Sequence, residues 1–406
     1  MAGCSLSRIG MLNTKENEVN TEHPAYWSGV FAMTLCVFAL IASEFMPVSL
    51  LTPIAADLNI SEGMVGQGIA ISGAFAVVTS LTISRVVGSM NRKTLLLLLT
   101  AMMSVSGIIL ALAQNYTIYM IGRALIGIVI GGFWSMSAAM AMRLVPPSDV
   151  PRAMAIFNSG NALAMVIAAP LGSYLGSIIG WRGAFFCLVP VALLALIWQW
   201  MSLPAMQVTI DKTEKPPSIL GLLRNPIVMI GMLAVSLFFM GQFSLFTYVR
   251  PFLETITQVD ISTLSLILLG IGVMGFIGTC VITIFLERRF YATLIVIPML
   301  MAAIAATLIF FGTSTMVVAV LLGLWGFLAT AAPVGWWSWL ARTLPEKAEA
   351  GGGLMVAVVQ LAIALGSTLG GILFDHSGYQ ATFVFSAIIL MIAAFLTSRL
   401  TARQLV

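Results

Sequence analysis

From residue 27 onward the chain alternates long apolar runs with short polar stretches. A helix that crosses a membrane needs about 20 mostly apolar residues, whereas a membrane-spanning strand needs only about ten and alternates polar with apolar side chains. Runs of this length therefore predict helices. Twelve spans are expected, at 27–53, 64–84, 94–113, 116–142, 153–179, 183–203, 226–249, 262–286, 291–312, 315–341, 352–374 and 380–398.

Three short segments of the first half recur in the second half. Arg92–Lys93 returns as Arg288–Arg289, MRLVP at 142–146 returns as ARTLP at 341–345, and LGSYLG at 171–176 returns as LGSTLG at 365–370. The offsets of 196, 199 and 194 residues are nearly equal. They predict two duplicated six-helix bundles with a binding cavity between them near the midplane of the membrane.

The expected organisation follows from these spans and from the polar stretch that joins the two bundles. It consists of an N-terminal tail at 1–26, a first six-helix bundle at 27–203, a linker at 204–225, a second six-helix bundle at 226–400 and a C-terminal tail at 401–406.

The basic residues predict an orientation in the membrane. Sixteen of the 19 Lys and Arg fall on the side of the N-terminus, Arg182 and Arg250 fall on the opposite side, and Arg123 lies within a span. Basic residues are concentrated in cytoplasmic loops of membrane proteins. Both termini are therefore expected in the cytoplasm.

The composition excludes several classes of protein. With 60% hydrophobic and 8% charged residues and a mean hydropathy of +1.05, the chain is not a soluble globule. The basic residues form no stripe that could follow a nucleic acid, and the four cysteines have no disulfide or metal-site spacing. The two histidines, His23 and His376, lie in the tail and at a span end, away from any catalytic cluster. We expect neither an enzyme nor a cofactor or metal.

Glu44 is the one charged residue between His23 and Asp57, and it lies in the middle of the first span. An ionised acid near the centre of a bilayer costs roughly 3 kcal/mol or more, so such residues usually face a cavity or a partner and often handle protons or cations. Glu44 therefore predicts proton-linked transport.

Arg123 in the fourth span is the predicted partner of Glu44. Counted inward from the outer span ends at a rise of about 1.5 Å per residue, both residues lie roughly 12 to 13 Å deep, so they can meet. Two alternatives are a fixed ion pair that only holds the first bundle together, and no direct contact.

A substrate cavity needs polar groups within apolar helices and flat surfaces on which a ring can stack. Amide side chains both donate and accept hydrogen bonds, and aromatic side chains stack on bases. The candidates are Asn158, Asn161, Gln242, Gln360, Phe133, Trp134, Tyr248, Trp336 and Trp337. The alternatives are hydrogen bonds between helices for the amides and plain packing for the aromatic residues.

Small residues recur every four positions along the fifth span, so they share one face of the helix. They are Gly160, Ala164, Ala168, Gly172, Gly176 and Gly180. Such a ridge lets helix backbones approach closely. Gly127 and Gly131 beside Arg123 have the same spacing, and there packing is the preferred interpretation.

Several segments together resemble the major facilitator superfamily, within its drug:proton antiporter branch. They are EFMPVSLLTPIAADL in the first span, GRALIGIVIGGFW in the fourth and APLGSYLG in the fifth. More narrowly, SEFMPVSLLTPIAADLNISEG, GGFWSMSAAMAMRLVPP and APLGSYLGSIIGWR are similar to purine ribonucleoside efflux pumps and their sugar-efflux relatives. The resemblance covers about residues 27–400.

The resemblance implies an all-α membrane protein with the major facilitator fold, in a bacterial inner membrane. It is expected to act as a monomer that exports a small, largely uncharged solute in exchange for protons. Purine ribonucleosides or analogues are the expected substrates; drug or sugar efflux and proton-coupled import remain alternatives. The resemblance also implies that the ridge contacts the eighth span and controls closure of the halves; generic packing without a gating role is the alternative. The associated gating or packing residues are Arg92, Lys93, Gly127, Gly131, Pro170, Gly172 and Gly176.

The chain departs from the family pattern at two places. Ser84 and Gly88 stand where the loop after the second span has a Gly and an Asp, so the gate contact of that Asp is not expected here. Ala169 stands before Pro170 where the antiporter motif has Gly, and small size is kept there.

Overall fold

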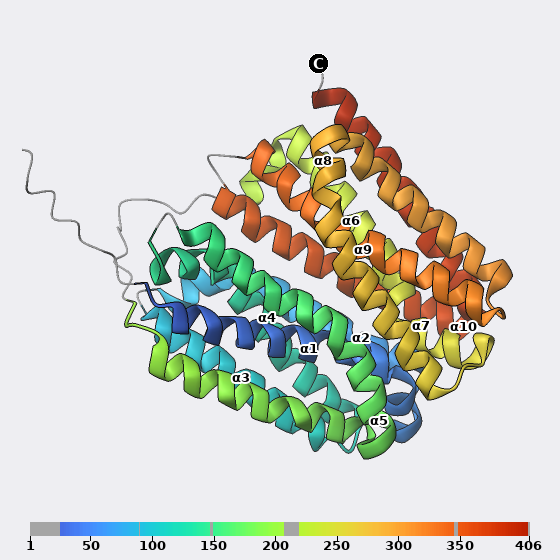
Figure 1. Ribbon diagram of the computed structural model, residues 1–406, viewed down its shortest axis with the longest axis horizontal. Coiled ribbons are helices and arrows are strands. Elements are labelled where there is room, and N and C mark those ends of the chain that lie inside the picture. The colour runs from blue at the N-terminus through green and yellow to red at the C-terminus, as the bar shows by residue number, and fades with distance from the viewer. Residues whose placement is uncertain (1–24, 89, 147–148, 207–218, 345–347, 405–406) are drawn as a thin grey trace, which may run out of the picture.

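The computed structural model describes residues 25–88, 90–146, 149–206, 219–344 and 348–404 (Figure 1). Most of the predicted N-terminal tail and residues 207–218 of the predicted linker lie outside the described residues. The helices are α1 (Trp27–Leu58), α2 (Glu62–Val87), α3 (Arg92–Ala111), α4 (Tyr116–Leu144), α5 (Val150–Ser202), η2 (Ile219–Arg224), α6 (Pro226–Phe246), α7 (Val249–Phe252), η3 (Leu253–Thr257), α8 (Ile261–Phe311), α9 (Thr315–Thr343) and α10 (Ala348–Gln404).

Within the described ranges, nine helices are long and apolar enough to cross a membrane. Three of them bend at a residue with non-helical backbone angles, at Gly180 in α5, Arg289 in α8 and Gly378 in α10. Each bend divides its helix into two spans, so the nine helices comprise the twelve predicted spans. The all-helical membrane fold is confirmed.

Gly180 and Gly378 show the duplication of the chain directly. Their φ angles are +74° and +76°, in a region that only glycine enters readily. They lie 198 residues apart, close to the offsets of the repeated segments. Both halves therefore turn from their fifth to their sixth span at the same kind of residue.

Polar residues in the short connections begin many of the helices. A side-chain oxygen at the cap accepts a hydrogen bond from a backbone N–H of the first turn, which has no partner within the helix. The capping residues are Ser61 for α2, Asn91 for α3, Asn115 for α4, Asn225 for α6 and Asp260 for α8.

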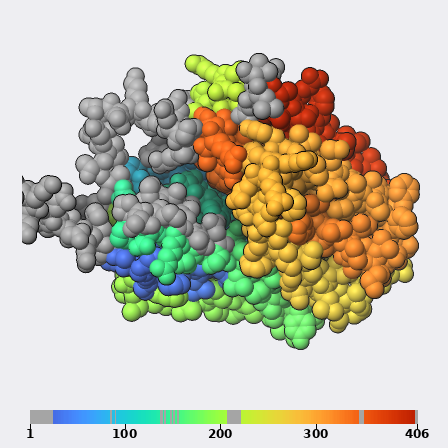
Figure 2. Space-filling model, turned by 45° about the horizontal axis from the view of Figure 1, so that its top comes forward, coloured from blue at the N-terminus to red at the C-terminus, as the bar shows by residue number. Residues whose placement is uncertain are grey.

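The helices form two bundles that lie side by side in Figure 1. We call α1–α5 the N-half and η2–α10 the C-half. Two faces are also named: the terminal face, where α1 and α6 begin, and the distal face, where the chain turns at Gly180 and Gly378. The halves meet toward the distal face and separate toward the terminal face, and the space-filling view shows a hollow between them there (Figure 2).

The small-residue ridge of α5 packs mainly against α1, within the N-half. A Cβ atom on Gly160 would lie 2.4 Å from the Thr34 carbonyl oxygen, and one on Gly176 would lie 2.4 Å from the Leu50 side chain. The N-half also meets α8 beside this ridge, where Gly272 lies against the backbone of Val166. The ridge residues Ala164 and Ala168 line a small space between the halves together with Gly272 of α8. The ridge therefore faces the eighth span at its alanines, while its glycines lie against α1, and its role in closing the halves stays a prediction.

Candidate functional site

Glu44 lies near the middle of α1, 17 residues after Trp27 and 14 before Leu58. Its side chain is only 6% exposed. Its carboxylate oxygen Oε1 accepts a hydrogen bond of 3.2 Å from Nε2 of Gln360 in α10. Two residues that the sequence singled out for different tasks thus meet, and their contact joins the N-half to the C-half.

Arg123 is completely buried in α4, and its guanidinium binds backbone rather than a carboxylate. Its Nη1 donates to the Ser43 carbonyl at 2.8 Å, its Nη2 to the Glu44 carbonyl at 3.2 Å and its Nε to the Gly68 carbonyl at 3.0 Å. Among the described residues no ion pair joins it to the Glu44 side chain. Arg123 therefore holds the α1 backbone at Glu44.

Pro47 explains why an arginine is needed at this position. A helical carbonyl normally accepts from the N–H four residues later, and proline has no N–H. The Ser43 carbonyl, four residues before Pro47, therefore lacks its helical donor. A backbone group freed in a membrane helix must find another partner, because lipid offers none. Arg123 provides that partner.

A small cavity of about 40 Å³ lies between the halves. Both halves contribute to its wall, which includes Phe45, Ala164, Gln242, Gly272, Trp325 and Thr330. A water molecule needs about 10 to 15 Å³, so the space holds about three, whereas ligand pockets usually exceed about 300 Å³. The halves would have to move apart here to admit a nucleoside-sized solute.

Two polar atoms in this wall lack partners. Among the described residues, Gln242 Oε1 and Trp325 Nε1 are buried and form no hydrogen bond. One is an acceptor and the other is a donor. Gln242 is a predicted substrate residue that the structure places at the seam between the halves, next to Phe45, the neighbour of Glu44 in the chain. Trp325 was missed, because its spacing in the sequence resembles that of any packed aromatic residue.

The other aromatic candidates lie apart from the cavity wall. Tyr248 is fully buried toward the distal face, where its hydroxyl donates to the Ser367 carbonyl at 2.7 Å and its ring stacks on Phe374. Trp336 packs edge-on against Trp339, 6.0 Å between ring centres.

Trp337 of α9 is 46% exposed, and the remaining substrate candidates are on N-half helices. Trp134 packs edge-on against Phe133, with 6.1 Å between ring centres. Asn161 is half-buried on α5. The side chain of Asn158 lies outside the described residues.

The predicted gating residues serve several packing tasks. A Cβ on Gly127 or Gly131 would lie 2.2 Å from the backbone oxygen of Ser72 or Ala76, so both glycines let α4 touch α2. Gly172 packs against Ser49 of α1, and Pro170, four residues after Val166, frees the carbonyl that lies against Gly272. Arg92 and Lys93 begin α3, where the Arg92 N–H donates to the Met206 carbonyl at 2.9 Å.

Polar contacts close the distal face. Asp375 of α10 accepts hydrogen bonds from the Ser61 hydroxyl and, at 3.0 Å, from the Gly63 N–H, at the start of α2. Tyr248 lies directly against Gly66, leaving no room for a side chain there. Neither Ser61 nor Asp375 was predicted from the sequence, in which the one available signal was a charged residue at a span end.

Comparisons with known proteins agree with this architecture. Residues 33–367 match the family described as Major Facilitator Superfamily. The transcription regulatory protein OpdE of Pseudomonas aeruginosa is 67% identical over 388 residues, 95% of this chain and 96% of that protein. The purine ribonucleoside efflux pump NepI of Salmonella enteritidis PT4 is 38% identical over 372 residues, 92% of this chain and 93% of that protein.

Solved structures show the same fold. A bacterial homologue of the human lysosomal transporter Spinster, in an inward-facing and unoccupied conformation, has a TM-score of 0.74 at 15% identity, covering 93% of this chain and 97% of that one. The nucleoside transporter NupG has a TM-score of 0.74 at 11% identity, covering 92% and 98%. This multi-pass membrane protein therefore belongs to the major facilitator superfamily, a family of transporters and not of enzymes.

Proposed function

We propose that this protein exports purine ribonucleosides or close analogues in exchange for protons, with Glu44 as the proton-binding group. One observation carries the proposal: the Glu44 carboxylate is buried near the middle of the membrane-spanning helix α1 and is hydrogen-bonded to Gln360 across the seam between the halves. The hydrogen bond that Glu44 forms there depends both on whether the carboxyl group is protonated and on the relative position of the halves.

The chemistry of a carboxyl group supports exchange at this position. An ionised carboxylate only accepts hydrogen bonds, whereas the protonated acid turns one oxygen into a donor. A bond to an ionised acceptor is also stronger than one to a neutral acceptor. A proton and the O–H or N–H groups of a solute therefore compete for the same oxygens, and Gln360 is held across the seam most firmly when Glu44 is ionised.

Arg123 serves this site by positioning Glu44. Its guanidinium holds the backbone of both Ser43 and Glu44, so the α1 segment that carries the acid cannot drift as α10 moves. In the proposed cycle the N-half keeps Glu44 in place, while Gln360 moves with the C-half. Rocking of the halves then changes the access and the partners of the acid together.

The substrate class rests on two supports. The efflux pump NepI, 38% identical, is named for purine ribonucleosides. Gln242 Oε1 and Trp325 Nε1 at the seam would suit a heterocycle edge that carries a donor beside an acceptor. Drug or sugar efflux would use the same proton site. Only the transported substrate would distinguish either of them from nucleoside efflux.

The Pseudomonas relative is named as a transcription regulatory protein. A carrier can influence transcription by changing the concentration of a solute that acts as an inducer. Transport by purified protein in vesicles free of nucleic acid would separate the two activities.

Purified protein in proteoliposomes tests the proposal. An antiporter accumulates radiolabelled inosine or adenosine when the lumen is acidic, in either orientation of the protein, whereas a symporter requires an acidic exterior. Glu44→Gln is expected to abolish accumulation. Glu287→Gln, which changes an exposed acid at the terminal end of the first span of α8, is the matched control and should transport normally. Accumulation by Glu44→Gln against a nucleoside gradient would refute the role of Glu44.

A further inference from the structure

A second proline in α1 frees a second carbonyl, close to the distal face. Pro53 lies four residues after Ser49, so the Ser49 carbonyl has no helical donor. Ser49 is fully buried, and its hydroxyl donates to the Met46 carbonyl at 2.9 Å. The freed carbonyl therefore needs a donor from another helix.

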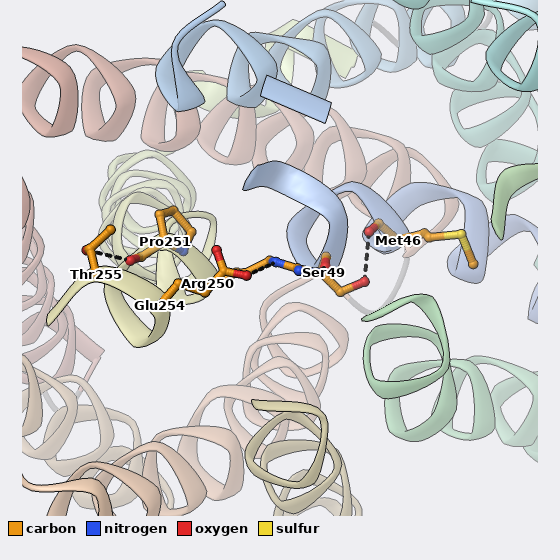
Figure 3. A network of polar contacts seen from close by, with 6 residues as sticks. All are labelled: Met46, Ser49, Arg250, Pro251, Glu254 and Thr255. Carbon is orange, nitrogen blue, oxygen red and sulfur yellow. Dashed lines mark hydrogen bonds and ion pairs between the residues drawn. The ribbon is translucent and has the colours of Figure 1, made fainter. Parts of the chain in front are cut away.

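That donor comes from the C-half. Nη1 of Arg250 in α7 donates to the Ser49 carbonyl oxygen, while its Nε donates to Glu254 Oε1 at 2.8 Å. Figure 3 shows the guanidinium between the Ser49 backbone on one side and the Glu254 carboxylate on the other. The arginine is only 5% exposed. A buried cation thus bonds to both halves at the closed face.

Glu254 has an unused acceptor in this arrangement. Its Oε2 is buried and has no hydrogen-bond partner among the described residues. A guanidinium can bind both oxygens of one carboxylate through two parallel N–H groups. Arg250 donates to only one of these oxygens, through Nε, while its Nη1 donates to Ser49.

The seventh span is irregular at this point. α6 ends at Phe246, and the span continues as the single turn α7 and the π-helical turn η3. Widened helical turns of this kind are frequent at functional sites. Arg250 and Glu254 thus lie on a broken helix end that can rotate without unwinding a continuous span.

We propose that Arg250 is a latch that holds the distal face closed by bonding to the Ser49 carbonyl, and that it opens by transferring this bond to the free oxygen of Glu254. A buried charge without acceptors is strongly unfavourable, so opening requires a replacement for Ser49 within the C-half. Glu254 Oε2 is such a replacement. The inference rests on the alternation of a transporter between two faces, and not on the identity of the solute.

The N-half contains a related arrangement that should not switch. Arg123 bonds to the Ser43 carbonyl that Pro47 frees, but both partners belong to the same half. Rocking of the halves leaves that bond in place. The Ser49 bond differs because its donor and acceptor separate when the distal face opens.

Spin-label distances across the distal face test the latch without any substrate. Ala56→Cys and Thr313→Cys place labels at exposed distal positions of the N-half and C-half, in protein whose Cys4, Cys187 and Cys280 are replaced by Ser. The unaltered latch should give mainly the short distance.

Two variants should raise the ratio of open to closed protein about tenfold or more, the effect of losing a hydrogen bond to a charged group. Arg250→Gln removes the cation, and Pro53→Ala gives Ser49 its own helical donor. The double variant should open no further than the larger single change, because both remove one bond. Pro190→Ala, in the second span of α5, controls for straightening a helix and should leave the distances unchanged.

Glu254→Gln should act in the opposite direction. It removes the acceptor that receives Arg250 on opening, so the short distance should persist and proton-driven transport should slow. Short distances in both Arg250→Gln and Pro53→Ala would overturn the latch. Opening in Glu254→Gln would overturn the transfer to Glu254. If Arg250→Gln does not fold, Pro53→Ala alone decides the first question.

Discussion

The bond between Arg123 and the Ser43 carbonyl can be isolated by a double-mutant cycle. Arg123→Leu removes the donor and leaves a buried carbonyl unpaired, because Pro47 prevents Ser43 from bonding within its own helix. Pro47→Ala restores the missing N–H at the i+4 position. If the structural explanation is correct, Arg123→Leu should cost less free energy of unfolding in the Pro47→Ala background than in the original chain.

The size of this difference follows from the contacts. Arg123 makes three backbone hydrogen bonds, at 2.8, 3.0 and 3.2 Å. A hydrogen bond to a charged group contributes about 1.5 to 3 kcal/mol. The bonds to Gly68 and Glu44 are lost in both backgrounds, so they cancel. Only the Ser43 bond remains, and the coupling energy should be about 1.5 to 3 kcal/mol.

Denaturant titration in detergent micelles measures the free energy of unfolding for the four chains of the cycle. Pro190→Ala replaces Pro47→Ala in a control cycle, where the expected coupling is near zero because Pro190 lies in the second span of α5. Additive effects of Arg123→Leu and Pro47→Ala would refute the reasoning. Should Arg123→Leu fail to fold, Arg123→Gln replaces it with the same expected sign.

Three further changes give distinct outcomes. Gly131→Ala places a Cβ 2.2 Å from the Ala76 oxygen and should destabilise the protein by about 1 to 3 kcal/mol, whereas Gly270→Ala, with nothing within 4 Å, should not; thermal unfolding compares them. Gln242→Met removes a buried unpaired acceptor, so it should stabilise the fold by about 1 to 3 kcal/mol while slowing nucleoside transport; unchanged transport would remove Gln242 from the site. Gly180→Ala has room for its Cβ, yet should cost about 1 to 2 kcal/mol through its φ of +74°, and an unchanged melting temperature would contradict this.

The main features of the site were visible in the sequence to different degrees. Glu44 stood out because a charge within a long apolar run is costly, and Gln242 and Gln360 because amides in such runs need partners. Their assignment to one seam required the structure. The partner of Arg123 was predicted from equal depth alone, which cannot distinguish a side-chain carboxylate from a backbone carbonyl at the same level.

The ridge of α5 was predicted from the sequence only in part. A spacing of four residues correctly predicts that Gly160, Gly172 and Gly176 share one face, but it does not name the helix that covers the face. The structure places α1 against these glycines, while Ala164 and Ala168 of the same ridge lie at the seam with α8. Residues one position apart in the sequence lie on neighbouring faces of the helix. The four-residue spacing of small residues therefore could not show which helix covers each face.

The sequence alone determined the twelve spans, the two duplicated halves and the buried acid. These properties are local, because lipid forces each span to be long, apolar and internally hydrogen-bonded. The tertiary structure decided which groups meet: Glu44 with Gln360, Arg123 with Ser43, and Arg250 with Ser49. Pro47 and Pro53 leave the Ser43 and Ser49 carbonyls without helical donors, because proline has no N–H. The arginines that donate to these carbonyls come from helices far away in the sequence, and only the packing of those helices brings donor and acceptor together.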